Sequence, residues 1–91
     1  MNTLTSDEIQ AKGIGLSFSE DELTCVLSDG RTITVPLAWY PRLLNATEAQ
    51  RNDFEWLGEG YGIHWPQVDE DLTVGGFLRG AMAPGGSRKR K

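Results

Sequence analysis

The dipeptide Asp29-Gly30 constrains the fold of this chain more than any other feature of its sequence. It lies between two apolar and β-branched runs, residues 23–27 and 32–35. An Asp-Gly pair in this setting is typical of a two-residue type I′ turn that joins antiparallel strands. Such a turn places Val26 opposite Ile33. Four side chains then share one face of the hairpin, which we expect to meet the core: Thr24, Val26, Ile33 and Val35.

A third strand precedes the hairpin. Ile14, Leu16 and Phe18 alternate with small or polar residues, which is the period of two that a half-buried strand shows. Pro36 ends the last strand of the hairpin, because proline has no N–H group to donate to a sheet ladder. The first part of the chain therefore predicts a three-stranded antiparallel meander.

Helical signals follow the meander. Residues 37–44 repeat apolar side chains at helical spacing over a single turn. Thr47-x-x-Gln50 has the form of a capping box and predicts a helix over residues 48–57. Phe54 and Leu57 would form the apolar side of that helix, and the glycines that follow would end it.

The last third of the chain predicts one more strand and one more helix. Residues 61–65 alternate as a brief strand does, and residues 73–79 form a helical segment with Thr73 as its N-cap and Gly80 as its stop. The predicted class is α+β, a three-stranded antiparallel meander with an Asp-Gly hairpin, followed by short helices and one further short strand.

Length and composition set the domain organisation. Ninety-one residues provide one core, which we assign to a single domain over residues 14–80, after an N-terminal arm at 1–13. Residues 81–91 are rich in glycine and basic side chains and predict a disordered tail. No stretch approaches the roughly 18 apolar residues of a membrane span. The single cysteine, Cys25, fits a reducing compartment, so we expect a cytoplasmic protein that does not engage the membrane.

The charge is divided unevenly along the chain. Residues 1–86 carry thirteen acidic and five basic side chains, a balance of −8, whereas the last four residues, Arg88 to Lys91, are all basic. A negative body repels phosphate backbones and attracts basic surfaces. We therefore expect no nucleic acid to bind the body, and we expect a protein partner, a small basic one.

Two groups of residues are candidates for binding that partner. Trp39 and Tyr40, followed by Arg42, are residue types that anchor protein interfaces, with core packing as the alternative. The acidic run 69–71 would attract a basic surface. Two alternative roles are open for this run. Its negative charges can stabilise the N-terminus of the following helix, or they can form ion pairs with Arg42 and Arg51 inside the domain. The candidate partner-binding residues are Trp39, Tyr40, Arg42, Asp69, Glu70 and Asp71.

The same acidic run lies five residues after His64, and carboxylates with an imidazole are common metal ligands and proton carriers. The sequence offers no second histidine and no positioned nucleophile beside them. We therefore expect no catalytic residue, no metal and no cofactor. A metal-assisted enzyme that uses His64 with Asp69, Glu70 and Asp71 is the alternative.

Four motifs occur in order along the chain: Leu27-Ser28-Asp29-Gly30-Arg31, Val35-Pro36-Leu37-Ala38-Trp39-Tyr40-Pro41-Arg42-Leu43, Ala46-Thr47-x-x-Gln50-Arg51 and Gly62-Ile63-His64-Trp65-Pro66-x-x-Asp69-Glu70-Asp71-Leu72. Together they resemble the domain-of-unknown-function family 2442 (DUF2442) over residues 13–80. The resemblance implies a small bacterial or phage-like α+β domain without an established activity, cofactor or catalytic residue. Some members look like they carry an added DNA-binding helix-turn-helix, and others are encoded beside a second short protein in what resembles a toxin–antitoxin pair.

The negative body and this resemblance predict a non-enzymatic protein-binding module, the antitoxin-like partner of a protein from a neighbouring gene. Two other classes stay open at this point. One is the small metal-assisted enzyme. The other is a homodimeric accessory domain that pairs through an exposed strand edge, related to the longer members with a helix-turn-helix.

Overall fold

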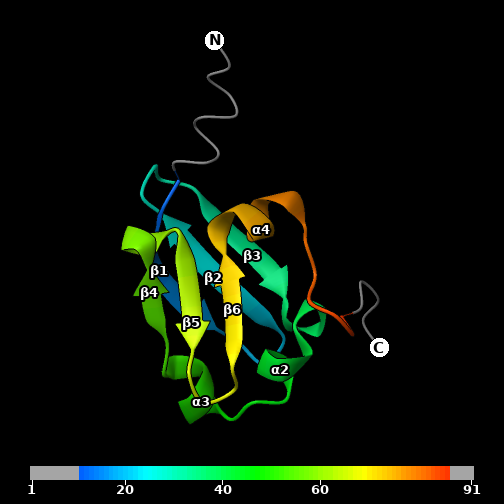
Figure 1. Ribbon diagram of the computed structural model, residues 1–91. Coiled ribbons are helices and arrows are strands. Elements are labelled where there is room, and N and C mark those ends of the chain that lie inside the picture. The colour runs from blue at the N-terminus through cyan, green and yellow to red at the C-terminus, as the bar shows by residue number, and fades with distance from the viewer. Residues whose placement is uncertain (1–10, 87–91) are drawn as a thin grey trace.

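The computed structural model describes residues 11–86, which form two small antiparallel sheets with short helices (Figure 1). The first sheet, called sheet A, has the strand order β1-β2-β3, and the second, sheet B, has the order β4-β5-β6. The elements in chain order are β1 (Gly13–Phe18), β2 (Glu22–Leu27), β3 (Thr32–Pro36), η1 (Leu37–Trp39), α2 (Pro41–Leu44), α3 (Glu48–Asn52), β4 (Glu55–Leu57), η2 (Gly58–Gly60), β5 (Gly62–Trp65), β6 (Glu70–Thr73) and α4 (Val74–Arg79). The predicted α+β class and the three-stranded meander are confirmed.

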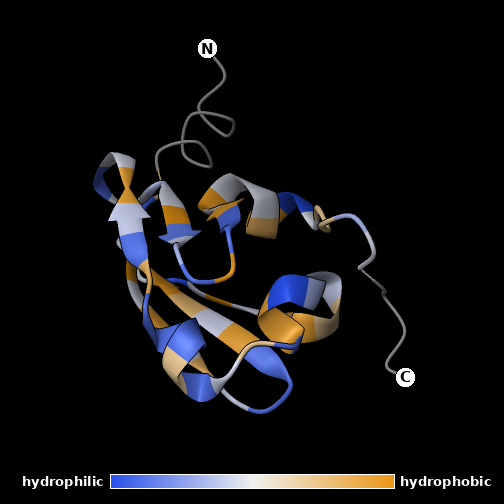
Figure 2. Ribbon diagram, turned by 60° about the horizontal axis from the view of Figure 1, so that its bottom comes forward, coloured by the Kyte–Doolittle hydropathy of each residue, from blue (hydrophilic) through white to orange (hydrophobic). Residues whose placement is uncertain are grey.

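The two sheets lie one over the other (Figures 1 and 2), and buried apolar residues of both sheets belong to one core cluster. Trp65 at the end of β5 is fully buried, and its Nε1–H donates to the carbonyl of Arg51 at 2.9 Å, so the indole is satisfied inside the core. The buried apolar residues are Ala11, Leu23, Cys25, Leu27, Val35, Leu37, Tyr40, Leu43, Ile63, Trp65, Val74 and Phe77. Within residues 11–86, no helix has the length and apolar character needed to cross a membrane.

The hairpin forms, but its register differs by one residue from the predicted one. The N–H of Leu27 donates to the carbonyl of Arg31 at 2.8 Å, and the N–H of Gly30 donates to the carbonyl of Leu27 at 3.1 Å. The loop therefore holds three residues, 28–30, with Gly30 at a φ of 97°. Three-residue loops that place glycine in the left-handed region are the common alternative to the type I′ turn. The residue opposite Ile33 is Cys25, rather than Val26.

This shift decides which side of β2 is buried. A slip of one residue exchanges the two faces of a strand, so Leu23, Cys25 and Leu27 point into the core. Thr24 and Val26, which the sequence placed in the core, lie on the outer face, and Val26 is 39% exposed. Burying two leucines removes more apolar surface from water than burying a threonine and a valine, which favours the three-residue loop.

Strand β1 contains a second departure. Its pairing with β2 shifts between Gly13 and Gly15, which is a β-bulge, and Ile14 within the bulge is 63% exposed. The prediction that Ile14 shares a buried face with Leu16 and Phe18 is therefore wrong for Ile14, although the other two pack against the core.

The predicted helix over residues 48–57 ends early. Helix α3 stops at Asn52, and residues 55–57 form β4, which pairs with β5. Phe54 and Trp56 are the reason, since their rings lie 5.7 Å apart and both contribute to the core. A Cβ atom on Gly13 would come within 2.4 Å of the Trp56 ring, which shows how closely β1 and β4 approach each other. The segment predicted as one further strand, β5, is the centre of a complete second sheet.

The helix caps agree with the sequence. Thr47 and Gln50 form the reciprocal capping box of α3, at 3.1 and 2.9 Å. The hydroxyl of Thr73 accepts the N–H of Gly76 at 2.8 Å and caps α4, and Gly80 ends that helix at a φ of 75°. Helix α4 is thus fixed at the end of β6, where it forms one wall of the cleft described next.

Candidate functional site

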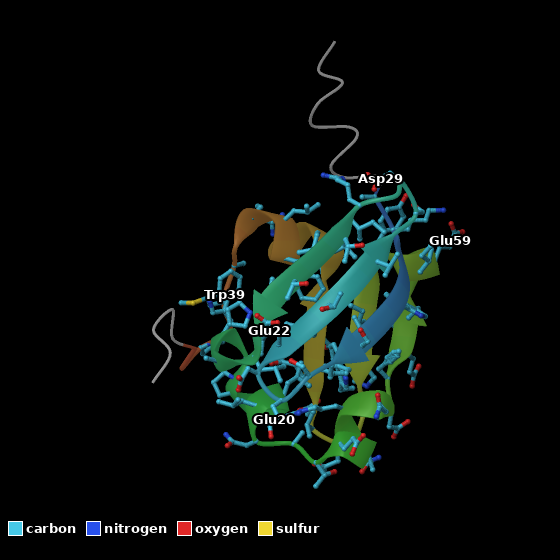
Figure 3. All side chains as sticks on the ribbon, turned by 180° about the vertical axis from the view of Figure 1, so that it is seen from behind. Glu20, Glu22, Asp29, Trp39 and Glu59 are labelled. Carbon is cyan, nitrogen blue, oxygen red and sulfur yellow. The ribbon has the colours of Figure 1, made fainter. Side chains whose placement is uncertain are left out.

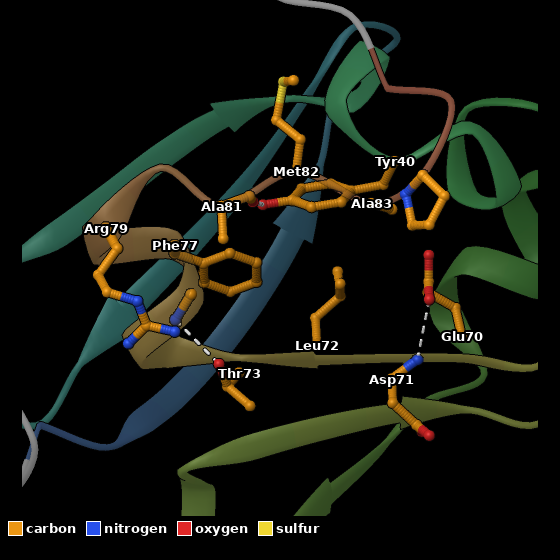
Figure 4. A pocket seen from close by; sticks show the side chains of 12 residues that line it. Tyr40, Glu70, Asp71, Leu72, Thr73, Phe77, Arg79, Ala81, Met82 and Ala83 are labelled. Atoms are coloured by element: carbon orange, nitrogen blue, oxygen red, sulfur yellow. Dashed lines mark hydrogen bonds between the residues drawn. The ribbon is translucent and has the colours of Figure 1, made fainter.

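A cleft of about 260 Å³ lies between the edge strand β6, helix α4 and the segment that follows α4 (Figure 4). Apolar side chains form most of its walls, among them Leu72, Phe77 and Met82. Tyr40 closes it on the side of η1. Three charged residues line it, Glu70, Asp71 and Arg79, and Figure 4 shows Glu70 and Arg79 at opposite ends.

Glu70 is the buried charged residue of this cleft, with 8% of its surface exposed. It lies opposite Trp65 in the sheet, on the core side of β6, because side chains alternate between faces along a strand. Its Oε1 accepts the backbone N–H of Asp71 at 3.1 Å. Its Oε2 is buried and has no hydrogen-bond partner among residues 11–86. An ionisable group in this state is uncommon in a folded protein, because a buried polar atom without a partner costs stability.

Tyr40 and the segment after α4 complete the cleft. The Tyr40 hydroxyl donates to the carbonyl of Ala81 at 3.3 Å, and its ring meets that of Phe77 edge to face at 6.0 Å. Burial, and secondarily the negative charge of Glu70, raise the pKa of Tyr40 to about 12. The phenol therefore keeps its proton at neutral pH and acts as a hydrogen-bond donor.

The segment itself was predicted to be part of a disordered tail from residue 81 onward. Instead, the N–H of Ala83 donates to the carbonyl of Trp39 at 3.1 Å, and the N–H of Gly86 donates to that of Ala83 at 2.9 Å. A Cβ atom on Gly86 would come within 2.2 Å of the Trp39 carbonyl oxygen, so this approach needs glycine. The remainder of the predicted tail, residues 87–91, lies outside the described residues, as does most of the predicted arm 1–13.

The six candidate partner-binding residues differ in their exposure. Tyr40 is 1% exposed and contributes to the core and the cleft, as the packing alternative anticipated, whereas Trp39 beside it is partly exposed. Asp69 is exposed in the turn before β6. Arg42 donates to the backbone carbonyl of Asp69, rather than to a carboxylate.

The alternative in which Arg42 and Arg51 form ion pairs with the acidic run is therefore wrong. Arg51 also binds backbone, the carbonyls of Leu43 and Leu44, both at 2.9 Å, and so caps α2. The residues 69–71 do not cap a helix either, because 70 and 71 belong to β6.

His64 and Asp71 pair across β5 and β6 on the outer face of sheet B, with His64 Nδ1 2.5 Å from Asp71 Oδ1. The hydrogen bond with Asp71, and secondarily the charges of Asp71, Glu55 and Asp69, raise the pKa of His64 above its usual value. The side chain of Glu70 lies on the opposite face of sheet B, which packs on the core. Since neighbours on a strand point to opposite faces, His64 and Glu70 do not meet around one ion. Throughout residues 11–86, no three His, Cys, Asp or Glu side chains are grouped as a metal site would require.

The site that the structure reveals was only partly visible in the sequence. The sequence predicts Tyr40 and Glu70 as binding residues, but it gives no signal for Phe77 or Met82 and does not separate Glu70 from Asp69 and Asp71. The alternation of Glu70 and Leu72 was the signal that could have separated Glu70 from its neighbours, had residues 70–73 been assigned to a strand.

Comparison with known proteins gives a family and a fold. The model of a family described as "Protein of unknown function (DUF2442)" matches residues 14–83, which confirms the resemblance stated above. A crystal structure of a protein of unknown function from Rhodospirillum rubrum is similar, with 26% identity and a TM-score of 0.70 over 81% of this chain and 92% of that one. A solution NMR structure of an uncharacterized protein from Chromobacterium violaceum shows the same fold, with 17% identity and a TM-score of 0.70 over 90% and 77% of the two chains. Comparison with curated proteins gives no match.

Proposed function

The chain belongs to the DUF2442 family, and since that description names no activity, we propose from its distribution of charge that it is a non-catalytic protein-binding module for a basic protein partner. The observation that carries the proposal is that the negative charge of the body is not neutralised internally. Residues 11–86 contain eleven acidic and five basic side chains.

The basic side chains of the body are largely engaged within the chain. Lys12 pairs with Glu59 at 3.2 Å and Arg31 with Asp29 at 2.8 Å. Arg42 and Arg51 donate to backbone carbonyls. In the part of the chain that the structure describes, Asp29 and Glu59 are thus the only carboxylates in an ion pair with a lysine or arginine.

Among residues 11–86, the other carboxylates have no such ion pair. Figure 3 shows two of them, Glu20 and Glu22, at one end of sheet A, whereas the ion-paired Asp29 and Glu59 lie at the other end. A surface of one sign speeds the encounter with an oppositely charged partner and sets its orientation, while repelling nucleic acid. This supports a basic protein as the partner better than a phosphate-bearing one.

The narrower form of the proposal is an antitoxin-like role, in which the partner is the product of a neighbouring gene and loses its toxicity when bound. We place this role in the cytoplasm, since the single thiol, Cys25, is buried and unpaired. The metal-assisted alternative has less support, because His64 and Glu70 lie on opposite faces of sheet B.

The test is co-expression of the chain with the product of each flanking gene, followed by calorimetry on the purified pair. We expect one basic product to bind, with an affinity that falls as salt rises from about 0.1 M to about 1 M, because the screening length shrinks from about 10 Å to about 3 Å. Replacing Glu20 and Glu22 by glutamine should slow association. If no neighbouring product binds, or if salt has no effect, the proposal is wrong.

Light scattering on the chain alone is the companion measurement. A stable dimer without any partner would favour the homodimeric alternative instead. Relief of growth arrest when the partner and the chain are expressed together would support the antitoxin-like form.

A further inference from the structure

We infer that the cleft beside Glu70 is a binding site for a single lysine side chain, a more specific claim that rests on the proposed binding of a basic protein. The exposed carboxylates attract a positively charged partner but do not recognise any particular residue of it. The cleft offers a place where one cation of that partner is recognised.

The carboxylate of Glu70 is the first part of the argument. It is more than nine-tenths buried, it lines the cleft, and its Oε2 has no partner among residues 11–86. Figure 4 shows the carboxyl group directed away from β6, toward the segment that follows α4. A donor that enters the cleft would complete this acceptor, and a cation would form the strongest such bond.

The walls of the cleft provide the second part. Leu72, Phe77 and Met82 give it an apolar lining, which suits the methylene stem of a long side chain whose charged end reaches Glu70. The volume of about 260 Å³ is smaller than the roughly 300–1,000 Å³ of pockets that hold drug-sized ligands. It fits one side chain better than a whole metabolite.

The geometry of the carboxylate favours lysine over arginine. Oε1 already accepts the N–H of Asp71, so a single oxygen is free. The guanidinium of arginine gains most from two parallel hydrogen bonds to both oxygens of a carboxylate, whereas an ammonium group binds as a point charge. Arg79 at the other end of the cleft disfavours a second cation there (Figure 4). The cleft therefore takes one lysine side chain at a time.

The experiment uses the ¹⁵N-labelled full chain and three probes, the N-acetyl, N-methylamide derivatives of lysine, arginine and norleucine. The lysine probe should shift the amide signals of Asp71, Thr73 and Phe77 at millimolar concentration. The norleucine probe, which keeps the stem without the charge, should not shift them, and the arginine probe should bind more weakly than lysine.

Glu70→Gln should abolish these shifts, because it removes the charge while keeping the shape of the side chain. The matched control is Glu48→Gln, which changes the net charge equally at an exposed position of α3 outside the cleft, and it should leave the shifts unchanged. The folded state of each variant is read from its own amide spectrum. Each of four results would overturn the inference. The lysine probe causes no shift at millimolar concentration, the norleucine probe causes an equal shift, the arginine probe binds more tightly than lysine, or Glu70→Gln binds the lysine probe as well as the wild type does.

Two further outcomes separate this inference from the proposed function. If a basic partner binds but Glu70→Gln does not reduce its affinity by at least about 30-fold, the partner does not use the cleft. The inference of a lysine site is then wrong, while the proposed function stands. If the probe binds while no partner is found, the proposed function falls instead. If the probe binds only after Arg88, Lys89, Arg90 and Lys91 are replaced by alanine, the occupant is the chain's own terminus, which overturns a partner lysine as the occupant.

Discussion

Replacing Glu70 by glutamine should stabilise the free protein. The substitution keeps the oxygen that accepts the N–H of Asp71 and exchanges only the unpartnered Oε2 for an amide NH₂ group. Burying one charge costs several kcal/mol after relaxation, and burying an amide without a partner costs about 1–3 kcal/mol. The difference predicts a gain of about 1–3 kcal/mol in the free energy of unfolding.

Urea unfolding followed by tryptophan fluorescence measures this gain, since Trp65 is fully buried and reports on the core. For a domain of this size each kcal/mol corresponds to about 4–8 °C in melting temperature, so a thermal scan is an independent check. Glu22→Gln, on the exposed side of β2, should stay within about 0.5 kcal/mol of the wild type.

A loss of stability on Glu70→Gln would refute the reasoning. It would show that the carboxylate is satisfied in the free protein, for example by a basic side chain of the terminus, and that it holds the fold together. A gain, combined with loss of lysine binding, would mean that the chain retains a destabilising residue because a ligand needs it.

Three further predictions concern single contacts. Thr73→Ala removes the cap of α4 and should cost about 0.5–2 kcal/mol in urea unfolding, with Thr73→Ser close to wild type. Asp71→Asn should lower the pKa of His64 in an NMR titration. In the wild type that pair stabilises the fold fully below the unfolded pKa of about 6.5 and loses its effect as pH rises through the raised folded value, so the difference between wild type and variant should vanish at high pH. Burial raises the pKa of Cys25 to about 11, so alkylation should be much faster in urea than in the native state, and equal rates would contradict its burial.

Local signals in the sequence predicted local structure well. The caps at Thr47 and Thr73 and the stop at Gly80 depend on contacts within a few residues, and each is found where the pattern placed it. The local pattern predicts helix where β4 forms, because Phe54 and Leu57 have helical spacing and because nothing within that segment indicates its pairing with β5. Pairing between strands is decided by burial across the whole domain.

The candidate site shows the same division. Residue type alone identified Glu70 as a candidate, since acidic residues near a histidine invite attention in any sequence. Its separation from Asp71 and His64 depends on the alternation of β6 and on which face of sheet B meets the core. The three adjacent carboxylates therefore differ in their surroundings, because Glu70 is buried whereas Asp69 and Asp71 are exposed.

The hairpin offers a direct test of whether core burial, rather than the turn, sets the register. Leu27 and Arg31 close the present loop of three residues. Deleting Ser28 leaves the same closing pair joined by Asp29-Gly30, which suits a type I′ turn, so the core face of β2 stays buried. The deletion loses the bonds between Ser28 and Lys12, at 2.8 and 3.4 Å, and should cost about 1–2 kcal/mol.

Deleting Arg31 is the matched control, because it also shortens the hairpin by one residue. To keep Val26 opposite Thr32, the chain must then draw Leu27, now 1% exposed, out of the core and into a four-residue loop. That loss is comparable to truncating a buried leucine, about 2–5 kcal/mol, and exceeds the cost of deleting Ser28. Urea unfolding of the two variants compares these costs. Equal destabilisation, or a larger loss on deleting Ser28, would show that the three-residue turn itself holds the register, and that the burial of Leu23, Cys25 and Leu27 follows from it.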